Sequence, residues 1–230
     1  MFNSEVQGDE AERMTKGERT RALIRETALR SFRERGYDDT TIRLIAQEAG
    51  VSVGNASHYF PTKSHLVQEL YLDVQQGHRT AAAELLPGTT DLVERLRIAY
   101  GTGLDGLAPF HRFAPGFLAA AVSPRSPINP LSADSSPALE IVAALFRDVV
   151  DGARHGLPTD IARALPDALV LGHLLLALFW VYDRSPGQRR TRRLLDRGLK
   201  LLALALPLAR LPLLRAPLRE ALDLIGEVRA

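Results

Sequence analysis

The stretch Thr40–Leu66, TTIRLIAQEAGVSVGNASHYFPTKSHL, contains two short helical patterns separated by a tight turn. Thr41 suits the N-cap of the first pattern, in which apolar residues recur at helical spacing. Gly50 stands where a left-handed residue ends a helix, and Ser52 supplies the N-cap of a second helix that ends near Tyr59. Two helices joined by a short turn that contains glycine form a helix-turn-helix motif.

The second helix of this motif is polar on one side. The pattern predicts that Ala56 and Phe60 are buried, and that the other residues of the helix face solvent. The expected exposed residues are Val53, Gly54, Asn55, Ser57 and His58. A helix this short and polar buries little apolar surface, so we interpret its open face as its functional feature.

The formal net charge of the 230-residue chain is only +2, which is too small to indicate nucleic-acid binding. The distribution of charge along the chain is therefore more informative. Residues Arg13–His65 hold ten Lys and Arg against six Asp and Glu, a surplus of four. Residues 1–13 are predicted to form a disordered acidic arm, either a solvated tail or a segment that moderates DNA binding. The chain has no cysteine, which excludes disulfides, thiol catalysis and Cys-ligated zinc and is compatible with a cytoplasmic protein.

Two features argue against a membrane or secreted protein. The N-terminus shows no apolar stretch after a basic start, so we expect no signal peptide and a cytoplasmic location. The longest uncharged apolar run, Ala168–Tyr182, has fifteen residues and is bounded by Asp167 and Asp183. It is shorter than a membrane span and predicts a buried helix, so no membrane partner is expected.

Helical periodicity continues along the chain and no strand alternation occurs, so we predict an all-α fold. Pro166 is expected to start the apolar helix, and His65 and His78 are expected at the surface. A Pro- and Ser-rich loop is expected over Ser123–Pro137. Beyond the motif, the helices are predicted over residues 15–35, 63–85, 91–107, 111–122, 136–155, 166–183, 188–206 and 217–228.

Two short matches to catalytic motifs lack the required context. Gly50–Gly54 fits the G-x-S-x-G nucleophile elbow, which needs a preceding strand, whereas a helix is predicted here. Gly101–Gly106 fits G-x-G-x-x-G but lies in a helical pattern, where close packing or a break beside a cavity explains the glycines better. No histidine pair has metal-ligand spacing. We therefore expect neither an enzyme nor a metal or cofactor.

The segment Gly36–Tyr71, GYDDTTIRLIAQEAGVSVGNASHYFPTKSHLVQELY, resembles the DNA-binding domain of the TetR family of transcriptional regulators. The resemblance is carried by Gly36-Tyr37, the two threonines, IAQEAGVS, Tyr59-Phe60 and Lys63, and it covers residues 14–72. It implies an N-terminal three-helix helix-turn-helix DNA-binding domain over residues 14–62. It also implies a C-terminal helical bundle, residues 63–230, that serves ligand binding and dimerisation.

Candidate DNA contacts come from the exposed face and from helix N-termini, whose free N–H groups suit phosphate. Asn55 can pair with adenine, and Val53 can contact a thymine methyl. Ser57 departs from the family pattern, which usually has an aromatic residue there, so its role as a phosphate anchor is in doubt. For each residue, a solvated surface position or a cap is the alternative. The candidates are Thr41, Arg43, Ser52, Val53, Gly54, Asn55, Ser57, His58, Tyr59 and Lys63.

The larger domain carries polar and aromatic residues within apolar patterns, as expected of a pocket between helices. Arg112 or His173 could recognise an acidic or hydroxylated effector. His173 could equally be a core residue, and the aromatic residues could simply pack. The candidate ligand-binding residues are Arg112, Phe113, Phe117, His173, Phe179 and Trp180.

The resemblance also implies a homodimer, in which the last two long helices pair with their copies in a four-helix bundle; burial of both in one subunit is the alternative. We therefore expect a homodimeric repressor that binds a palindromic double-stranded DNA operator and is released by a small apolar or amphiphilic ligand. A transcriptional activator, and a helical ligand-binding protein without a DNA function, remain as alternatives.

Overall fold

The computed structural model describes residues 15–229, and within this range it contains α-helices and no strand. The predicted all-α class is confirmed, whereas the predicted acidic arm, residues 1–13, lies outside the described residues. The helices are α2 (Lys16–Arg35), α3 (Ile42–Glu48), α4 (Val53–Tyr59), α5 (Lys63–Leu85), α6 (Leu92–Leu107), α7 (Ala114–Ala121), α8 (Ser136–Asp151), α9 (Thr159–Tyr182), α10 (Arg189–Ala205) and α11 (Pro212–Arg229).

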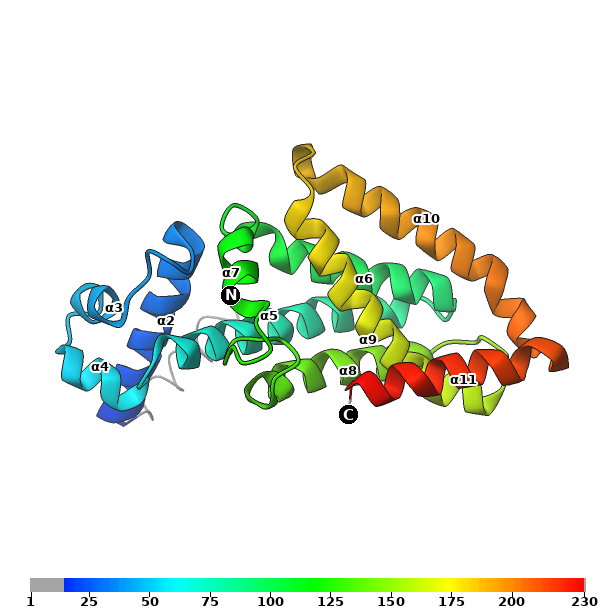
Figure 1. Cartoon of the computed structure of the whole chain (residues 1–230), viewed down its shortest axis with the longest axis horizontal. Helices are drawn as coiled ribbons and strands as arrows, with labels where there is room; N and C mark the ends of the chain where they lie inside the picture. Colours follow the sequence, from blue (N-terminus) through cyan, green and yellow to red (C-terminus); the bar gives the residue numbers. More distant parts are fainter. Residues whose placement is uncertain (1–14, 230) are drawn as a thin grey trace.

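The helices are arranged along one long axis (Figure 1). Helices α2, α3 and α4 form one end of the molecule, and α5 runs from that end into the larger helical part. Helices α10 and α11 meet at the opposite end. One continuous helix therefore belongs to both parts.

The helix-turn-helix forms as predicted because each of its helices is capped locally. The Thr41 hydroxyl accepts from Leu44 N at 3.1 Å, and the Ser52 hydroxyl accepts from Asn55 N at 3.1 Å. Gly50 has φ of +68°, in the left-handed region, which reverses the chain between α3 and α4.

The smaller part of the molecule has its own hydrophobic core. Ile24, Phe32, Ile45 and Phe60 of this core are at most 2% exposed. The N-terminal half of α5 adds buried residues to it, and so do α7 and the loop that follows α7. The smaller core is therefore completed by residues of α7 and of the loop after it, which lie far along the sequence from the helix-turn-helix.

The larger core joins α6, α8 and α9 with residues of α5, α10 and α11. A buried arginine, Arg95, organises one edge of it. Its guanidinium donates to the carbonyl oxygens of Val149, Leu86, Thr89 and Asp148 at 2.8–3.0 Å. These bonds join the last turn of α8, at Asp148 and Val149, to the turn that follows α5, at Leu86 and Thr89.

Several predicted helix boundaries were wrong. Helix α9 begins at Thr159 and contains Pro166, which was expected to start it. Helix α11 likewise begins at Pro212 and contains Pro217. A proline inside a helix removes one hydrogen bond, but Pro166 lies among buried apolar residues whose packing outweighs that loss. Helix α8 also ends earlier than predicted, at Asp151.

Helix α9 is 24 residues long and is apolar enough, by length and composition, to cross a membrane. The sequence underestimated its length because the predicted start lay at Pro166. Its buried residues, Leu169, Val170, Leu176 and Trp180 among them, belong to the larger core. The prediction of a buried helix is therefore confirmed for one face of α9 only, because Leu175, Leu178 and Tyr182 on the rest of the helix are 56%, 42% and 69% exposed.

Candidate functional site

Helix α4 presents the polar face that the sequence predicts. Ala56 and Phe60 are buried, at 1% and 2% exposure, whereas Val53 on the outer face is 46% exposed. Gly54, Asn55 and His58 are also exposed, and Ser57 and Tyr59 are half-buried. The predicted division of this helix into an inner and an outer side is confirmed.

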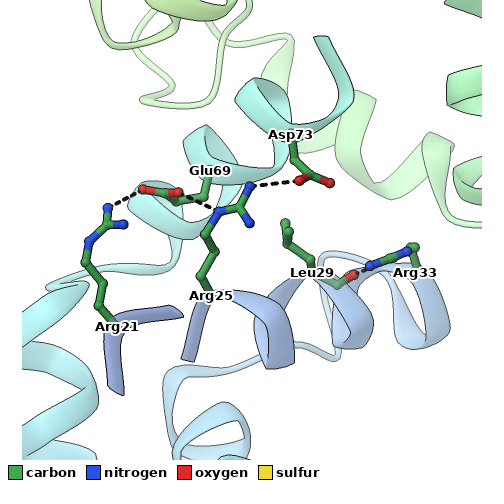
Figure 2. Close-up of polar contacts among 6 residues, drawn as sticks. All are labelled: Arg21, Arg25, Leu29, Arg33, Glu69 and Asp73. Atoms are coloured by element: carbon green, nitrogen blue, oxygen red, sulfur yellow. Dashed lines mark hydrogen bonds and ion pairs between the residues drawn. The ribbon is translucent and has the colours of Figure 1, made fainter. Parts of the chain in front are cut away.

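Three of the basic residues counted near the motif are already paired within the protein: Arg21, Arg25 and Arg35, the last with Glu48 at 2.7 Å. Figure 2 shows Arg21 and Arg25 of α2 facing Glu69 and Asp73 of α5. Arg21 bonds Glu69 at 2.5 Å, and Arg25 bonds Glu69 at 2.9 Å and Asp73 at 2.8 Å. The charge count over Arg13–His65 did not include Glu69 and Asp73, because both carboxylates lie beyond His65, in α5. These ion pairs tie α2 to α5 and leave less positive charge for DNA.

Lys63, a candidate phosphate contact, is engaged inside the protein as well. Its Nζ donates to Tyr37 O at 2.7 Å and lies 3.8 Å from the centroid of the Tyr37 ring. Burial lowers the pKa of Lys63, and the charges of Asp38 and Asp39 oppose that shift. The lysine thus anchors the start of α5, and any phosphate contact would use its two other N–H groups.

Arg43, a candidate DNA contact, is unpaired among the described residues. It is exposed on α3, and its guanidinium forms no ion pair or hydrogen bond with a described residue. Thr40, next to the capping Thr41, instead faces inward, and its hydroxyl donates to Gly36 O at 2.6 Å.

The sequence missed one neighbour of α4. A Cβ on Gly17 would lie 3.3 Å from the hydroxyl oxygen of Tyr59, so the first turn of α2 lies beside the end of α4. The exposed Lys16 precedes this glycine and adds a candidate phosphate contact. No local signal in the sequence relates residues 17 and 59, which only the packing of α2 on α4 brings together.

A cavity of about 500 Å³ lies in the larger part of the molecule. Helices α5, α7, α8 and α9 and the loop after α7 contribute its wall. The lining is predominantly apolar, and none of the described residues that line it is charged. Its size and lining are typical of a site for a small organic molecule.

The structure brings three of the six candidate ligand-binding residues to this cavity, namely Phe117, His173 and Trp180. The other three lie outside its lining. Arg112 is exposed and lies over the ring of Phe113, with 5.3 Å from its guanidinium carbon to the ring centroid. Phe113 in turn packs against Gly36, and Phe179 is 42% exposed on α9.

His173 stacks on a second histidine. Its ring lies 5.3 Å from that of His78, with 14° between the planes. The prediction that His78 lies at the surface was wrong, because α6 and α9 cover this part of α5 and leave His78 only 2% exposed. His78 Nε2 donates to Ala99 O at 2.7 Å.

Gly103 explains how the two rings fit. A Cβ at this position would lie 3.1 Å from Cε1 of each histidine. The expectation of close packing at the glycine-rich segment is confirmed for Gly103, whereas Gly101 and Gly106 face open space. The segment lies inside α6 with no preceding strand, so it is no dinucleotide-binding turn.

Burial changes the protonation of the stacked pair. It lowers the pKa of His78, against a smaller opposing effect of the hydrogen bond to Ala99. Burial, followed by the charge of His78, lowers the pKa of His173 to about 3. Both imidazoles are therefore neutral near pH 7.

Phe117 connects the cavity to the smaller core, through α2. It lines the cavity and also packs against the smaller core. Its ring lies 5.5 Å from that of Phe32 in an edge-on arrangement and 5.7 Å from that of Tyr37. A molecule in the cavity would touch a side chain that contacts α2 directly.

The last helices leave apolar side chains exposed on the outside of the larger part. Leu201 and Leu204 of α10 are 68% and 73% exposed, and Leu213 of α11 is 86% exposed. Tyr182, at the end of α9, is 69% exposed. Exposed apolar surface of this extent is typical of a protein–protein interface.

The fold and these sites define an all-α helix-turn-helix transcriptional regulator with a separate helical domain. Residues 24–70 match the model of the bacterial regulatory proteins of the tetR family. Residues 95–227, more than half of the chain, match the model of the tetracyclin repressor-like C-terminal domain. The chain belongs to the TetR family, as its resemblance to that family implied.

Individual relatives agree with this assignment. A segment of 67 residues is 39% identical to an HTH-type transcriptional regulator of Mycobacterium tuberculosis, but it spans 28% of this chain and only 32% of that protein. The fold is similar to a TetR transcriptional regulator from Nitrosomonas europaea (TM-score 0.59, 22% identity, 80% of this chain and 98% of that chain). It is also similar to FadR of Thermus thermophilus, a TetR family repressor in complex with lauroyl-CoA (TM-score 0.51, 24% identity, 77% and 94% coverage).

Proposed function

We propose that this protein is a cytoplasmic, homodimeric repressor that binds a palindromic DNA operator and leaves it when a small apolar or amphiphilic effector binds. The observation that carries the proposal is the orientation of α4. Its inner side is held in the core by Ala56 and Phe60, so the outer side stays exposed and in a fixed position. The major groove of DNA admits a helix with such a polar face.

Within this proposal the DNA contacts divide into two groups. Val53, Asn55 and Ser57 would face base edges, whereas Arg43 and Tyr59 would contact phosphates. The N-termini of α3 and α4 begin at the exposed caps Thr41 and Ser52, and N–H groups at the start of a helix suit phosphate.

The exposed leucines of α10 and α11 support a dimer. Burying them against a second copy removes apolar surface from water, and closed two-fold symmetry is the commonest way to do so. A two-fold dimer would present two α4 helices to major grooves about 34–36 Å apart, which requires a palindromic operator.

Two contacts support communication between effector and DNA. Helix α5 starts at Lys63, beside the motif, and reaches the cavity at Val74 and Gln75. Phe117 of α7 provides the second contact, through Phe32. An effector that favours a different position of these residues would shift the dimer toward a spacing that no longer fits the operator.

DNA binding can be tested by fluorescence anisotropy with DNA from upstream of the protein's own gene. We expect Asn55→Ala to relax the preference at one base pair by about 1–3 kcal/mol, because it removes a pairing with a base edge. Uniform weakening across operator variants would contradict a base contact at Asn55. Failure of the unmodified protein to bind any upstream fragment would contradict the proposed function.

A reporter gene placed behind the bound fragment distinguishes repression from activation. We expect expression to rise when the protein is deleted. A fall would show that the protein activates transcription.

A further inference from the structure

Most polar side chains of the cavity are engaged by the protein itself. Tyr71 Oη donates to Ile128 O at 2.9 Å, and Ser135 Oγ donates to Asn129 O at 2.8 Å. The side-chain oxygen of Asn129 accepts from Leu131 N at 2.8 Å. The Tyr71 bond holds the loop after α7 against α5, and the other two bonds lie within that loop, so the groups that make them have a structural role.

His173 and the indole N–H of Trp180 differ from them, because neither makes a hydrogen bond with a described residue, and of the two only the imidazole can also accept a hydrogen bond. His173 lines the cavity and is only 6% exposed. Its contacts are ring contacts with His78 and Phe146. Among the described residues, Arg35 Nη1 is the one fully buried side-chain nitrogen or oxygen without a partner, so the ring nitrogens of His173 are not sealed off and can be reached from the cavity.

The surroundings of His173 also exclude a charged partner. Among the described residues that line the cavity there is no Lys, Arg, Asp or Glu. Arg112, which the sequence suggested for an acidic effector, lies outside the lining. His173 itself is neutral near pH 7, because burial and His78 lower its pKa to about 3. A carboxylate at this point would be desolvated without a counter-charge.

We propose that the cavity binds an uncharged, largely apolar molecule that carries a hydroxyl or carbonyl oxygen, and that this oxygen hydrogen-bonds to the imidazole of His173. The apolar remainder of the molecule fills the space between α5, α7, α8 and α9. The chemistry of the bound molecule is inferred from the cavity alone. Only its role as the effector rests on the proposed function.

The first test compares two probes with the same carbon chain, 1-decanol and decanoate. Each is titrated calorimetrically into the full-length protein at pH 8, where decanoate is ionised. We expect 1-decanol to bind at least tenfold more tightly, since only decanoate brings a charge into the apolar wall. Equal or tighter binding of decanoate would overturn the inference, and so would the failure of 1-decanol to bind.

The second test changes the imidazole. We expect His173→Phe to weaken the binding of 1-decanol by about fivefold, the effect of one neutral hydrogen bond. His173→Gln, which keeps a hydrogen-bonding group, should retain most of the affinity. His155→Phe is the matched control, because His155 lies in the turn between α8 and α9, outside the cavity lining. Unchanged binding in a folded His173→Phe variant would overturn the inference, and thermal melting of each variant verifies the fold.

The same protein samples are tested for binding to upstream DNA. A protein that binds this DNA but not 1-decanol contradicts the cavity chemistry and leaves the proposed regulator intact. A protein that binds 1-decanol but no upstream DNA supports the cavity chemistry and contradicts the proposed function.

Discussion

The outer face of α4 and the wall of the cavity place polar side chains in opposite surroundings. On α4, Asn55 and His58 are exposed, so water satisfies their hydrogen-bonding groups. In the cavity, His173 is 6% exposed among apolar side chains and lacks a hydrogen-bonding partner among the described residues. An exposed polar group indicates only a surface that can bind, whereas an unpaired group in an apolar cavity wall indicates the chemistry of the molecule that the cavity would accept.

The two regions are physically joined. Phe117 belongs to the cavity wall and packs on Phe32 in the smaller core, and α5 runs through both regions. The ion pairs of Arg21 and Arg25 with Glu69 and Asp73 fix α2 on α5 (Figure 2). A change in the cavity therefore has a short path to the position of α4.

The largest effect is expected at the inner side of α4. Phe60→Ala should lower the free energy of unfolding by about 3–5 kcal/mol, because it empties a fully packed site. Val53→Ala on the outer side of the same helix should change it by less than about 0.5 kcal/mol. Urea unfolding of both variants provides the measurement. Similar losses in the two variants would contradict the division of α4 into an inner and an outer side.

The next effect concerns pH and the stacked histidines. In the folded protein the pKa values of both are lowered, so the unfolded chain binds more protons as the pH falls below the ordinary histidine pKa of about 6.5. The free energy of unfolding should be highest above about pH 6.5. The contribution of His173 should be lost as the pH falls from there to its folded-state pKa of about 3. Each titrating histidine contributes a slope of about 1.4 kcal/mol per pH unit.

Urea unfolding at several pH values measures this slope. We expect His173→Phe to show a shallower loss of stability in acid than the unmodified protein, since one of the two titrating groups is absent. An identical slope in both proteins would mean that His173 is not held neutral by the fold.

A smaller effect is expected on the salt dependence of DNA binding when Arg43 on α3 is replaced. Arg43→Ala should reduce the dependence of log affinity on log salt by about one unit, as expected for the loss of one phosphate contact. Arg147→Ala is the matched control, because Arg147 is exposed on α8, in the larger part of the molecule. Salt titrations of operator binding measure both. Equal slopes for the two variants would remove Arg43 from the DNA-binding surface.

The smallest effect is expected for two glycines of α6, near the stacked histidines of the cavity wall. Gly101→Ala should stabilise the protein by about 0.5–1 kcal/mol, because alanine is the better helix former and the added Cβ meets open space. Gly103→Ala should destabilise it instead, because its Cβ would press on His78 and His173. Thermal melting distinguishes the two. A gain in stability for Gly103→Ala would show that the stacked pair can move.

The sequence predicted the helix-turn-helix almost completely because the motif depends on neighbours. Thr41, Gly50 and Ser52 act within three residues of their own position, and Ala56 and Phe60 follow from helical periodicity alone. Elsewhere the same reasoning was less successful. Pro166 and Pro217 were interpreted as helix starts, because the packing that keeps each inside a helix comes from residues distant in the sequence.

The candidate effector site shows the limit of sequence reasoning. Phe117, His173 and Trp180 were singled out by type and do line the cavity, but Arg112, Phe113 and Phe179 look equally suitable in the sequence and lie outside its lining. Whether an aromatic residue on a helix lines a cavity, packs in a core or faces solvent depends on which helix covers it. One sequence without tertiary contacts does not contain that information.

The sequence by itself determined the helical class, the motif and its exposed face, since caps, glycine conformations and periodicity are local properties of the chain. Tertiary structure alone decided that Arg21 and Arg25 are paired with α5, that His78 is buried, and that His173 faces a cavity without a charged residue in its described lining. The physical reason is that charge neutralisation and desolvation depend on groups brought together from distant parts of the chain, and only the folded protein brings them together.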